Sequence, residues 1–269
     1  MRHALFLPLF DDLAEPAVVV RLAAEAEEAG WDGVFVWDHV SYRAPVVGAA
    51  DPWIVLAAIA CATEQVRLGP MVTPLPRRRP VKLAREVATL DRLSGGRVVF
   101  GVGLGSDGAG ELSATGEQLD DRVRGQMLDE GLEVLRAAWS GEQLRHRGEH
   151  YVADGLTLLP TPVQRPGPPV WVAMRKGNQA PLRRAARFEG IFPIEVATPD
   201  DLREIVSAVQ GVRAEVGATG AYDVAVGGPP GTDPTGFEKA GATWWMAGFS
   251  PYDLRAEEVR SVLRDGPAR

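Results

Sequence analysis

Eight short apolar runs, each followed by a segment of helical periodicity, recur along this chain of 269 residues. Such a run is typical of a buried strand, and apolar residues at helical spacing are typical of the crossover helix that follows it. Eight units of this kind predict an α/β fold, a (β/α)8 TIM barrel with loop insertions at its C-terminal face. The expected strands are residues 5–7, 34–37, 66–72, 97–102, 169–173, 190–192, 222–226 and 242–246. The expected helices are 18–29, 51–62, 80–93, 123–138, 178–187 and 198–216, a short helix near Phe237, and a last helix capped by 250–253.

An open, doubly wound sheet is the alternative fold. That fold usually has fewer strands, and its first strand usually leads into a glycine-rich phosphate loop, where this chain has Pro8-Leu9-Phe10. Two connections, residues 103–121 and 140–168, exceed the usual loop length. Long loops in compact domains are usually lids or binding loops, so we expect the first to be mobile without ligand. We expect the second to hold short strands near 151–152 and 156–159.

The amino-acid composition argues against several classes of function. With 45% hydrophobic and 24% charged residues, the chain suits one globular domain, residues 1–269. The net charge of −7 and the lack of a basic helical stripe argue against a nucleic-acid partner. One cysteine allows no internal disulfide, and four scattered histidines suggest no metal site. No apolar segment is long enough to span a membrane and no signal peptide is evident, so we expect a cytoplasmic protein without a membrane partner.

The most informative site signal is a strand that stops at two titratable side chains. Residues 34–37 are apolar, and Asp38 and His39 follow directly. Barrel strands carry catalytic groups at their carboxyl ends, and imidazole changes charge near neutral pH, which suits proton transfer. The structural alternative is that Asp38 caps the next helix and His39 packs beneath it. Position alone leaves both interpretations open.

Three blocks of the sequence resemble the bacterial luciferase-like flavin or deazaflavin oxidoreductases. They are residues 26–39, which include Gly-Trp-Asp-Gly-Val-Phe-Val-Trp-Asp-His, residues 69–80 and residues 88–105. The similarity continues through residues 127–139, 162–169, 183–187 and 241–245. These blocks follow one another in the family's order over nearly the whole chain. The family's eight-stranded barrel agrees with the strand count obtained independently.

The resemblance implies a flat tricyclic cofactor across the C-terminal mouth of the barrel, where the ring carries the redox chemistry. In relatives, the residues that match Val72 and Thr73 support the back face of the ring through a bulge or a cis peptide bond, here near Pro70-Met71. Gly103, Gly105 and Ser106 leave the fourth strand, and glycine lets the backbone approach a ring or phosphate closely. These five residues are candidates for cofactor binding.

Two loops compete for the phosphate of such a cofactor. Arg175-Lys176-Gly177-Asn178 follows the fifth strand and precedes a helix, whose N-terminus suits anions, although Asn178 could also be an ordinary helix cap. Gly227-Gly228-Pro229-Pro230-Gly231-Thr232 follows the seventh strand, a usual phosphate position in barrels. Many relatives carry two glycines where this chain has Ala173-Met174-Arg175, and the sequence does not rank the two loops.

Charge and aromatic residues refine the expected ligands. Arg77-Arg78-Arg79 follows the third strand and favours coenzyme F-420 over FMN, because F-420 carries a phosphate and a polyglutamate tail; a solvated surface run is the alternative. Trp37, Tyr42 and Trp245 are the predicted aromatic residues of the substrate pocket.

Together with the resemblance, these residues predict an oxidoreductase that uses F-420 or FMN to transfer hydride to, or oxygenate, a small organic substrate. His39 would donate or accept the accompanying proton, and Asp38 would orient His39 or the ring. The resemblance is also compatible with a separate reductase that supplies reduced cofactor. It is compatible with a homodimer as well. One alternative is a catalytically silent flavin-binding homologue that acts as a carrier or sensor. Another is a barrel hydrolase or isomerase, which would need paired carboxylates or a metal set at strand ends, and neither is evident.

Overall fold

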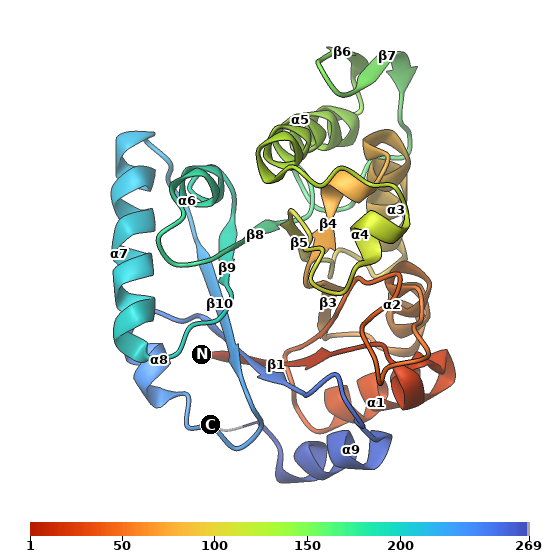
Figure 1. The fold of residues 1–269 in the computed structure, drawn as a ribbon, viewed down its shortest axis with the longest axis vertical. Helices are drawn as coiled ribbons and strands as arrows, with labels where there is room; N and C mark the ends of the chain where they lie inside the picture. Colours follow the sequence, from red (N-terminus) through yellow and green to blue (C-terminus); the bar gives the residue numbers. More distant parts are fainter. Residues whose placement is uncertain (268–269) are drawn as a thin grey trace.

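The strands form a parallel barrel that is surrounded by helices (Figure 1). In the computed structural model, which describes residues 1–267, nine strands form one sheet in the order β3-β2-β1-β11-β10-β9-β8-β5-β4, with parallel pairings. These strands are β1 Arg2–Leu7, β2 Gly33–Val36, β3 Arg67–Pro70, β4 Thr73–Pro74, β5 Phe100–Gly103, β8 Val170–Met174, β9 Gly190–Pro193, β10 Asp223–Gly228 and β11 Trp244–Gly248.

β3 and β4 occupy one position in the barrel. Only Met71 and Val72 separate these strands, and the peptide bond between the two residues is cis. The ring closes beside β3, where Leu68 forms a parallel bridge with Val98. Nine strands therefore fill eight positions, and the predicted (β/α)8 barrel is confirmed. The cis bond lies one residue later than predicted, since it follows Met71 rather than Pro70.

Capping residues fix where the outer helices begin. The Asp51 side chain accepts two backbone hydrogen bonds at 2.9 and 3.0 Å, and Pro52 takes the first helical position of α2. The prediction that residues 250–253 cap the last helix is wrong, because α9 begins after Arg255 and its first N–H donates to Asp12 Oδ2 at 2.8 Å. The helices are α1 Pro16–Glu28, α2 Pro52–Ala62, α3 Pro80–Leu93, α4 Glu111–Ala114, α5 Asp121–Ser140, α6 Gln179–Ala185, α7 Pro199–Glu215, α8 Thr235–Lys239 and α9 Ala256–Asp265, with short 3-10 turns η1 Asp11–Ala14 and η2 Leu75–Arg77.

Side chains along the strands alternate between the barrel interior and the helix layer. Phe35, Trp171 and Trp244 are fully buried and pack together inside the barrel, with ring centroids 5.5 to 5.8 Å apart. Val34 and Trp245, which neighbour two of them in sequence, belong to the core between strands and helices. A side chain with interior parity just past a strand's carboxyl end therefore projects into the mouth of the barrel.

Both long connections hold structure of their own. Residues 104–120 carry the short helix α4 and line the barrel mouth. In the second connection, β6 Gln143–Arg147 pairs antiparallel with β7 Val152–Thr157, and this hairpin projects beyond α5 (Figure 1). Two short strands were expected near 151–152 and 156–159, but one strand, β7, overlaps both segments, and its partner β6 was not predicted. Within residues 1–267, no helix has the length and apolar character needed to cross a membrane.

Candidate active site

A cavity of about 760 Å³ opens at the carboxyl ends of the barrel strands. Its walls come from the ends of β1, β2, β4, β5, β8 and β9, from residues 104–120 and from α5 and α6. His39 and Trp37 contribute from the end of β2, and Arg175 and Asn178 contribute from the end of β8. This volume lies within the range of cavities that bind a small molecule or a cofactor.

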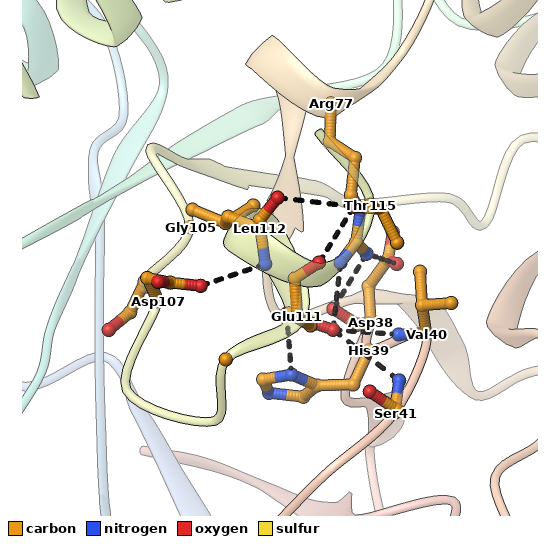
Figure 2. Close-up of polar contacts among 12 residues, drawn as sticks. Asp38, His39, Val40, Ser41, Arg77, Gly105, Asp107, Glu111, Leu112 and Thr115 are labelled. Carbon is orange, nitrogen blue, oxygen red and sulfur yellow. Dashed lines mark hydrogen bonds and ion pairs between the residues drawn. The ribbon is translucent and has the colours of Figure 1, made fainter. Parts of the chain in front are cut away.

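His39 is held by a carboxylate that the sequence did not single out. Its Nδ1 lies 2.9 Å from Oε1 of Glu111, the first residue of α4 (Figure 2). Oε2 of Glu111 accepts a hydrogen bond from Val40 N at 2.9 Å and lies 2.9 Å from Nη1 of Arg77. The Glu111 side chain is 1% exposed, whereas that of His39 is 25% exposed. Residues 104–120 are thus attached to the end of β2 through a buried, fully paired carboxylate.

The surroundings of Glu111 keep its carboxyl ionised and decide which ring nitrogen of His39 carries the shared hydrogen. Burial alone would raise the pKa of the Glu111 carboxyl, but the hydrogen bond and charge of His39, the Val40 N–H and the Arg77 guanidinium lower this pKa to about 2. Glu111 is therefore ionised at neutral pH and can only accept hydrogen bonds, so Nδ1 of His39 carries the shared hydrogen. The other ring nitrogen, Nε2, is left to exchange a proton with a ligand.

Asp38 is buried and belongs to an adjoining network. Its Oδ1 accepts hydrogen bonds from Nη2 of Arg77 at 2.7 Å and from Nη2 of Arg78 at 2.8 Å, while its Oδ2 accepts from Thr73 Oγ1 at 2.8 Å. Asp38 thereby ties the end of β2 to β4 and η2. Glu111, rather than Asp38, is the carboxylate that contacts the ring of His39.

These contacts change the interpretation of the arginine run. The side chain of Arg77 is 5% exposed and that of Arg78 is 23% exposed, and both are paired with buried carboxylates. The two guanidinium charges are therefore balanced inside the protein. They do not form the solvent-facing basic patch on which the preference for an anionic cofactor tail was based.

The predicted glycine loop lines the cavity. Gly103, Gly105 and Ser106 all contribute to its wall, as does Val72. A Cβ at Gly103 would lie 2.9 Å from a methyl carbon of Val72, and one at Gly105 would lie 2.8 Å from Pro74. Gly105 also has a φ of +76°, which favours glycine. Glycine therefore lets the end of β5 pass close to β4, and it leaves the backbone open toward the cavity.

The predicted loop after β8 divides between two roles. Arg175 and Asn178 line the cavity, and Arg175 also donates to Glu195 at 2.8 Å. Lys176 instead pairs with two carboxylates of α7, at 2.6 and 2.7 Å, and a Cβ at Gly177 would have no neighbour within 4 Å. Asn178 is the N-cap residue of α6, but its side chain makes no capping hydrogen bond. Lys176 and Gly177 thus lie outside the cavity wall that they were predicted to form.

Two buried arginines that the sequence analysis missed line the same part of the cavity. Arg124 donates to the carbonyls of Leu104 and Gly105 at 3.3 and 3.2 Å, while its Nε is buried without a partner among the described residues. Arg184 forms two hydrogen bonds with Asp129, at 2.6 and 2.7 Å. The spacing contained a signal for Arg124, because it stands one helical turn before Leu128, on the buried face of α5.

Two of the three predicted aromatic residues surround His39. The ring of Trp37 lies 5.9 Å from that of His39, and the ring of Tyr42 lies 5.1 Å from it. Trp245 is instead buried against Phe237, with ring centroids 5.2 Å apart, so its assignment to the pocket is corrected. The reason is strand parity, since its neighbour Trp244 occupies the interior position.

Comparison with known proteins identifies the family. Residues 6–240 match the family model described as luciferase-like monooxygenase. The chain belongs to this family. The luciferase-like chain is 33% identical to the F-420-dependent glucose-6-phosphate dehydrogenase of Nakamurella multipartita over 184 residues, which are 66% of this chain and 51% of that protein. It is 31% identical to the oxygenase component of the flavin-dependent trigonelline monooxygenase of Acinetobacter baylyi over 160 residues, 60% of this chain and 43% of that protein. The chain spans about half the length of these curated relatives.

Solved structures share the fold at lower identity. An F-420-dependent secondary alcohol dehydrogenase superposes with a TM-score of 0.80 at 20% identity, over 92% of both chains. A monooxygenase from Streptomyces bottropensis superposes with a TM-score of 0.81 at 22% identity, over 98% of this chain and 97% of the other. These likenesses establish the luciferase-like barrel.

Proposed function

We propose that this luciferase-like chain is an oxidoreductase that binds coenzyme F-420 or FMN at the barrel mouth and acts on a small organic molecule. The observation that carries the proposal is the pair His39–Glu111, a proton-transfer group with a fixed tautomer in the wall of a cavity of cofactor size. The surrounding residues fit a flat ring with a phosphorylated side chain. Val72 and Gly103 offer a wall without protruding polar groups. Nη2 of Arg124 pairs with Asp121, but its buried Nε lacks an acceptor that a phosphate oxygen would supply.

The cofactor, when bound, would supply the redox chemistry, as hydride transfer or as activation of oxygen. The protein would orient the reactants and move the proton. With hydrogen on Nδ1, neutral His39 can accept a proton at Nε2, and the Glu111 carboxylate then stabilises the imidazolium. Trp37, whose ring lies 5.9 Å from that of His39, and Phe6, whose ring lies 5.5 Å from that of Trp37, add apolar surface to the same cavity wall.

F-420 is our preferred cofactor. The support comes from two relatives, since the F-420-dependent glucose-6-phosphate dehydrogenase is 33% identical over its matched region and an F-420-dependent hydroxymycolic acid dehydrogenase of Mycobacterium tuberculosis is 28% identical over 243 residues. The charges of Arg77 and Arg78 no longer contribute to this choice. Fluorescence titration of the purified chain with each cofactor tests it, and FMN binding that is tighter by tenfold, about 1.4 kcal/mol, would reverse the preference. An FMN enzyme of this kind would also need reduced cofactor from a separate reductase, and the homodimer stays a prediction.

Replacing His39 separates an enzyme from a carrier or sensor. We expect His39→Ala to lower the single-turnover rate by about 10²–10⁴, because a positioned proton-transfer group contributes that much. Cofactor affinity should change little. The thermal midpoint of the same variant is measured in parallel. A near-normal rate with a sharply lowered midpoint would make His39 a structural residue and would favour the silent flavin-binding homologue.

A further inference from the structure

A second cavity, of about 790 Å³, lies beside the first at the mouth of the barrel. It is formed by the ends of β9, β10 and β11 and by α9. Phe6 and Phe192 line both cavities, and their rings meet edge to face with centroids 5.6 Å apart. Phe6 also lies 5.5 Å from Trp37. The second cavity therefore adjoins the cavity that holds His39 along this aromatic pair and along Ile194 and Glu195, which also line both.

Glycines at the ends of β10 and β11 form part of the wall of the second cavity. A Cβ at Gly228 would lie 2.8 Å from the ring of Trp245, so packing requires glycine there. Gly248 differs, because its Cβ would meet Phe6 at 3.5 Å, an ordinary contact distance, and it lies at the end of an extended strand. Packing therefore does not require glycine at position 248. The missing side chain instead leaves room in the cavity.

The charges around this cavity are acidic. Among the described residues, its lining includes no lysine, arginine or histidine, and its two titratable carboxylates are Glu195 and Glu258. Glu195 is paired with Arg175, and Glu258 accepts a hydrogen bond from Arg255 N at 3.2 Å. The apolar lining consists mainly of Phe6, Phe192, Ile194, Phe249, Leu254 and Val262. A phosphate or carboxylate that entered would give up hydration and meet no cationic side chain in this lining, because the nearby Arg175 is already paired with Glu195, and this loss is costly.

We propose that the second cavity binds the substrate of the oxidoreductase, and that this substrate is an apolar organic molecule without a phosphate or carboxylate group. The assignment of the ligand as substrate rests on the proposed function. Its position supports the assignment, because Tyr252 in this cavity lies 6.1 Å from Tyr42, whose ring lies 5.1 Å from that of His39. The chain thereby differs from its relative named for glucose-6-phosphate, which is a phosphate ester.

Two matched probes test the charge class directly. Isothermal titration calorimetry would measure the binding of naphthalenemethanol and of its phosphate monoester to the purified chain. We expect the alcohol to bind at least tenfold more tightly than the ester. Binding of the ester as tightly as the alcohol, or more tightly, would overturn the inference.

Variants locate the probe in this cavity. Gly248→Leu should weaken alcohol binding at least tenfold, and the smaller Gly248→Ala should weaken it less; an unchanged affinity in both would place the probe elsewhere and overturn the assignment. Ser261 is an exposed residue of α9 on the cavity wall, so its replacement should not affect folding. Ser261→Arg should raise the affinity for the phosphate ester at least fivefold relative to Ser261→Leu, which adds bulk without charge. An equal affinity in these two variants would contradict the charge argument.

Cofactor titrations of the same proteins distinguish a failure of the proposed oxidoreductase function from a failure of the proposed substrate class. If neither F-420 nor FMN binds while the probes behave as expected, the proposed function fails and the ligand class of the cavity stands. If a cofactor binds normally but the phosphate ester is preferred, the substrate inference fails alone.

Discussion

Replacing Glu111 by glutamine tests whether this carboxylate sets the protonation state of His39. Glutamine has nearly the same shape but only one acceptor oxygen. Val40 N and Arg77 are obligate donors at 2.9 Å, so the amide oxygen is expected to turn toward them. The amide NH2 then faces Nδ1 of His39, which must accept instead of donate. The hydrogen moves to Nε2, and His39 can no longer take a proton at that nitrogen, the one that Glu111 leaves free.

The pKa of Glu111 gives the magnitude. A pKa lowered from 4.5 to about 2 corresponds to about 3 kcal/mol of folding free energy at 1.36 kcal/mol per pKa unit. Because this pKa is lower in the folded state, the contribution is present above pH 4.5 and is lost as the pH falls toward 2. The variant keeps neutral hydrogen bonds, so we expect Glu111→Gln to cost about 1–3 kcal/mol at neutral pH.

Urea unfolding and nitrogen NMR measure the two effects. The stability difference between wild type and variant should be larger at about pH 5 than at about pH 3.5, where the wild-type carboxylate has lost part of its contribution. The nitrogen shifts of the His39 ring should report hydrogen on Nδ1 in the wild type and on Nε2 in the variant. Glu117→Gln, the same change on the same segment, is the control. A variant within about 0.5 kcal/mol of wild type at both pH values, with hydrogen still on Nδ1, would refute this account of Glu111.

Three further outcomes are expected. Asp38→Asn should destabilise the protein by about 3–5 kcal/mol in urea unfolding, because it leaves the charges of Arg77 and Arg78 without their partner. A loss below about 1 kcal/mol would contradict a stabilising role of the Asp38–Arg77–Arg78 contacts. Arg124→Gln should weaken FMN binding by about tenfold, about 1.4 kcal/mol, and riboflavin binding hardly at all in fluorescence titrations, whereas equal losses would argue against a phosphate contact. Limited proteolysis with mass spectrometry should show less cleavage within residues 104–120 when cofactor is bound, and more cleavage there in Glu111→Gln. Equal cleavage in the free wild type, the cofactor-bound wild type and the variant would count against a ligand-dependent lid.

The fold could be predicted from the sequence because its strands and helices have clear local patterns. Alternating apolar runs and helical patterns gave the barrel, and α3 has the predicted bounds, because Pro80 and the glycines after Ser94 mark its two ends. His39 was found because a strand exit in a parallel barrel leads to the mouth. Glu111 was not found, since it lies 72 residues from His39 in a polar loop whose path the pattern does not determine.

Two of the errors were avoidable with long-range reasoning. Trp244 and Met246 share a parity that places both inside the barrel, so Trp245 had to face the helices. The arginine run is the more instructive error, because Asp38 follows a fully buried strand and an ionised carboxylate in that position needs a partner. Since β2 and β3 are neighbours in the barrel order, the chain after β3 passes beside the end of β2. Arg77 and Arg78 were therefore the nearest cations that Asp38 could recruit, and a charge run next to a buried acid is better interpreted as its counter-charge than as a free binding patch.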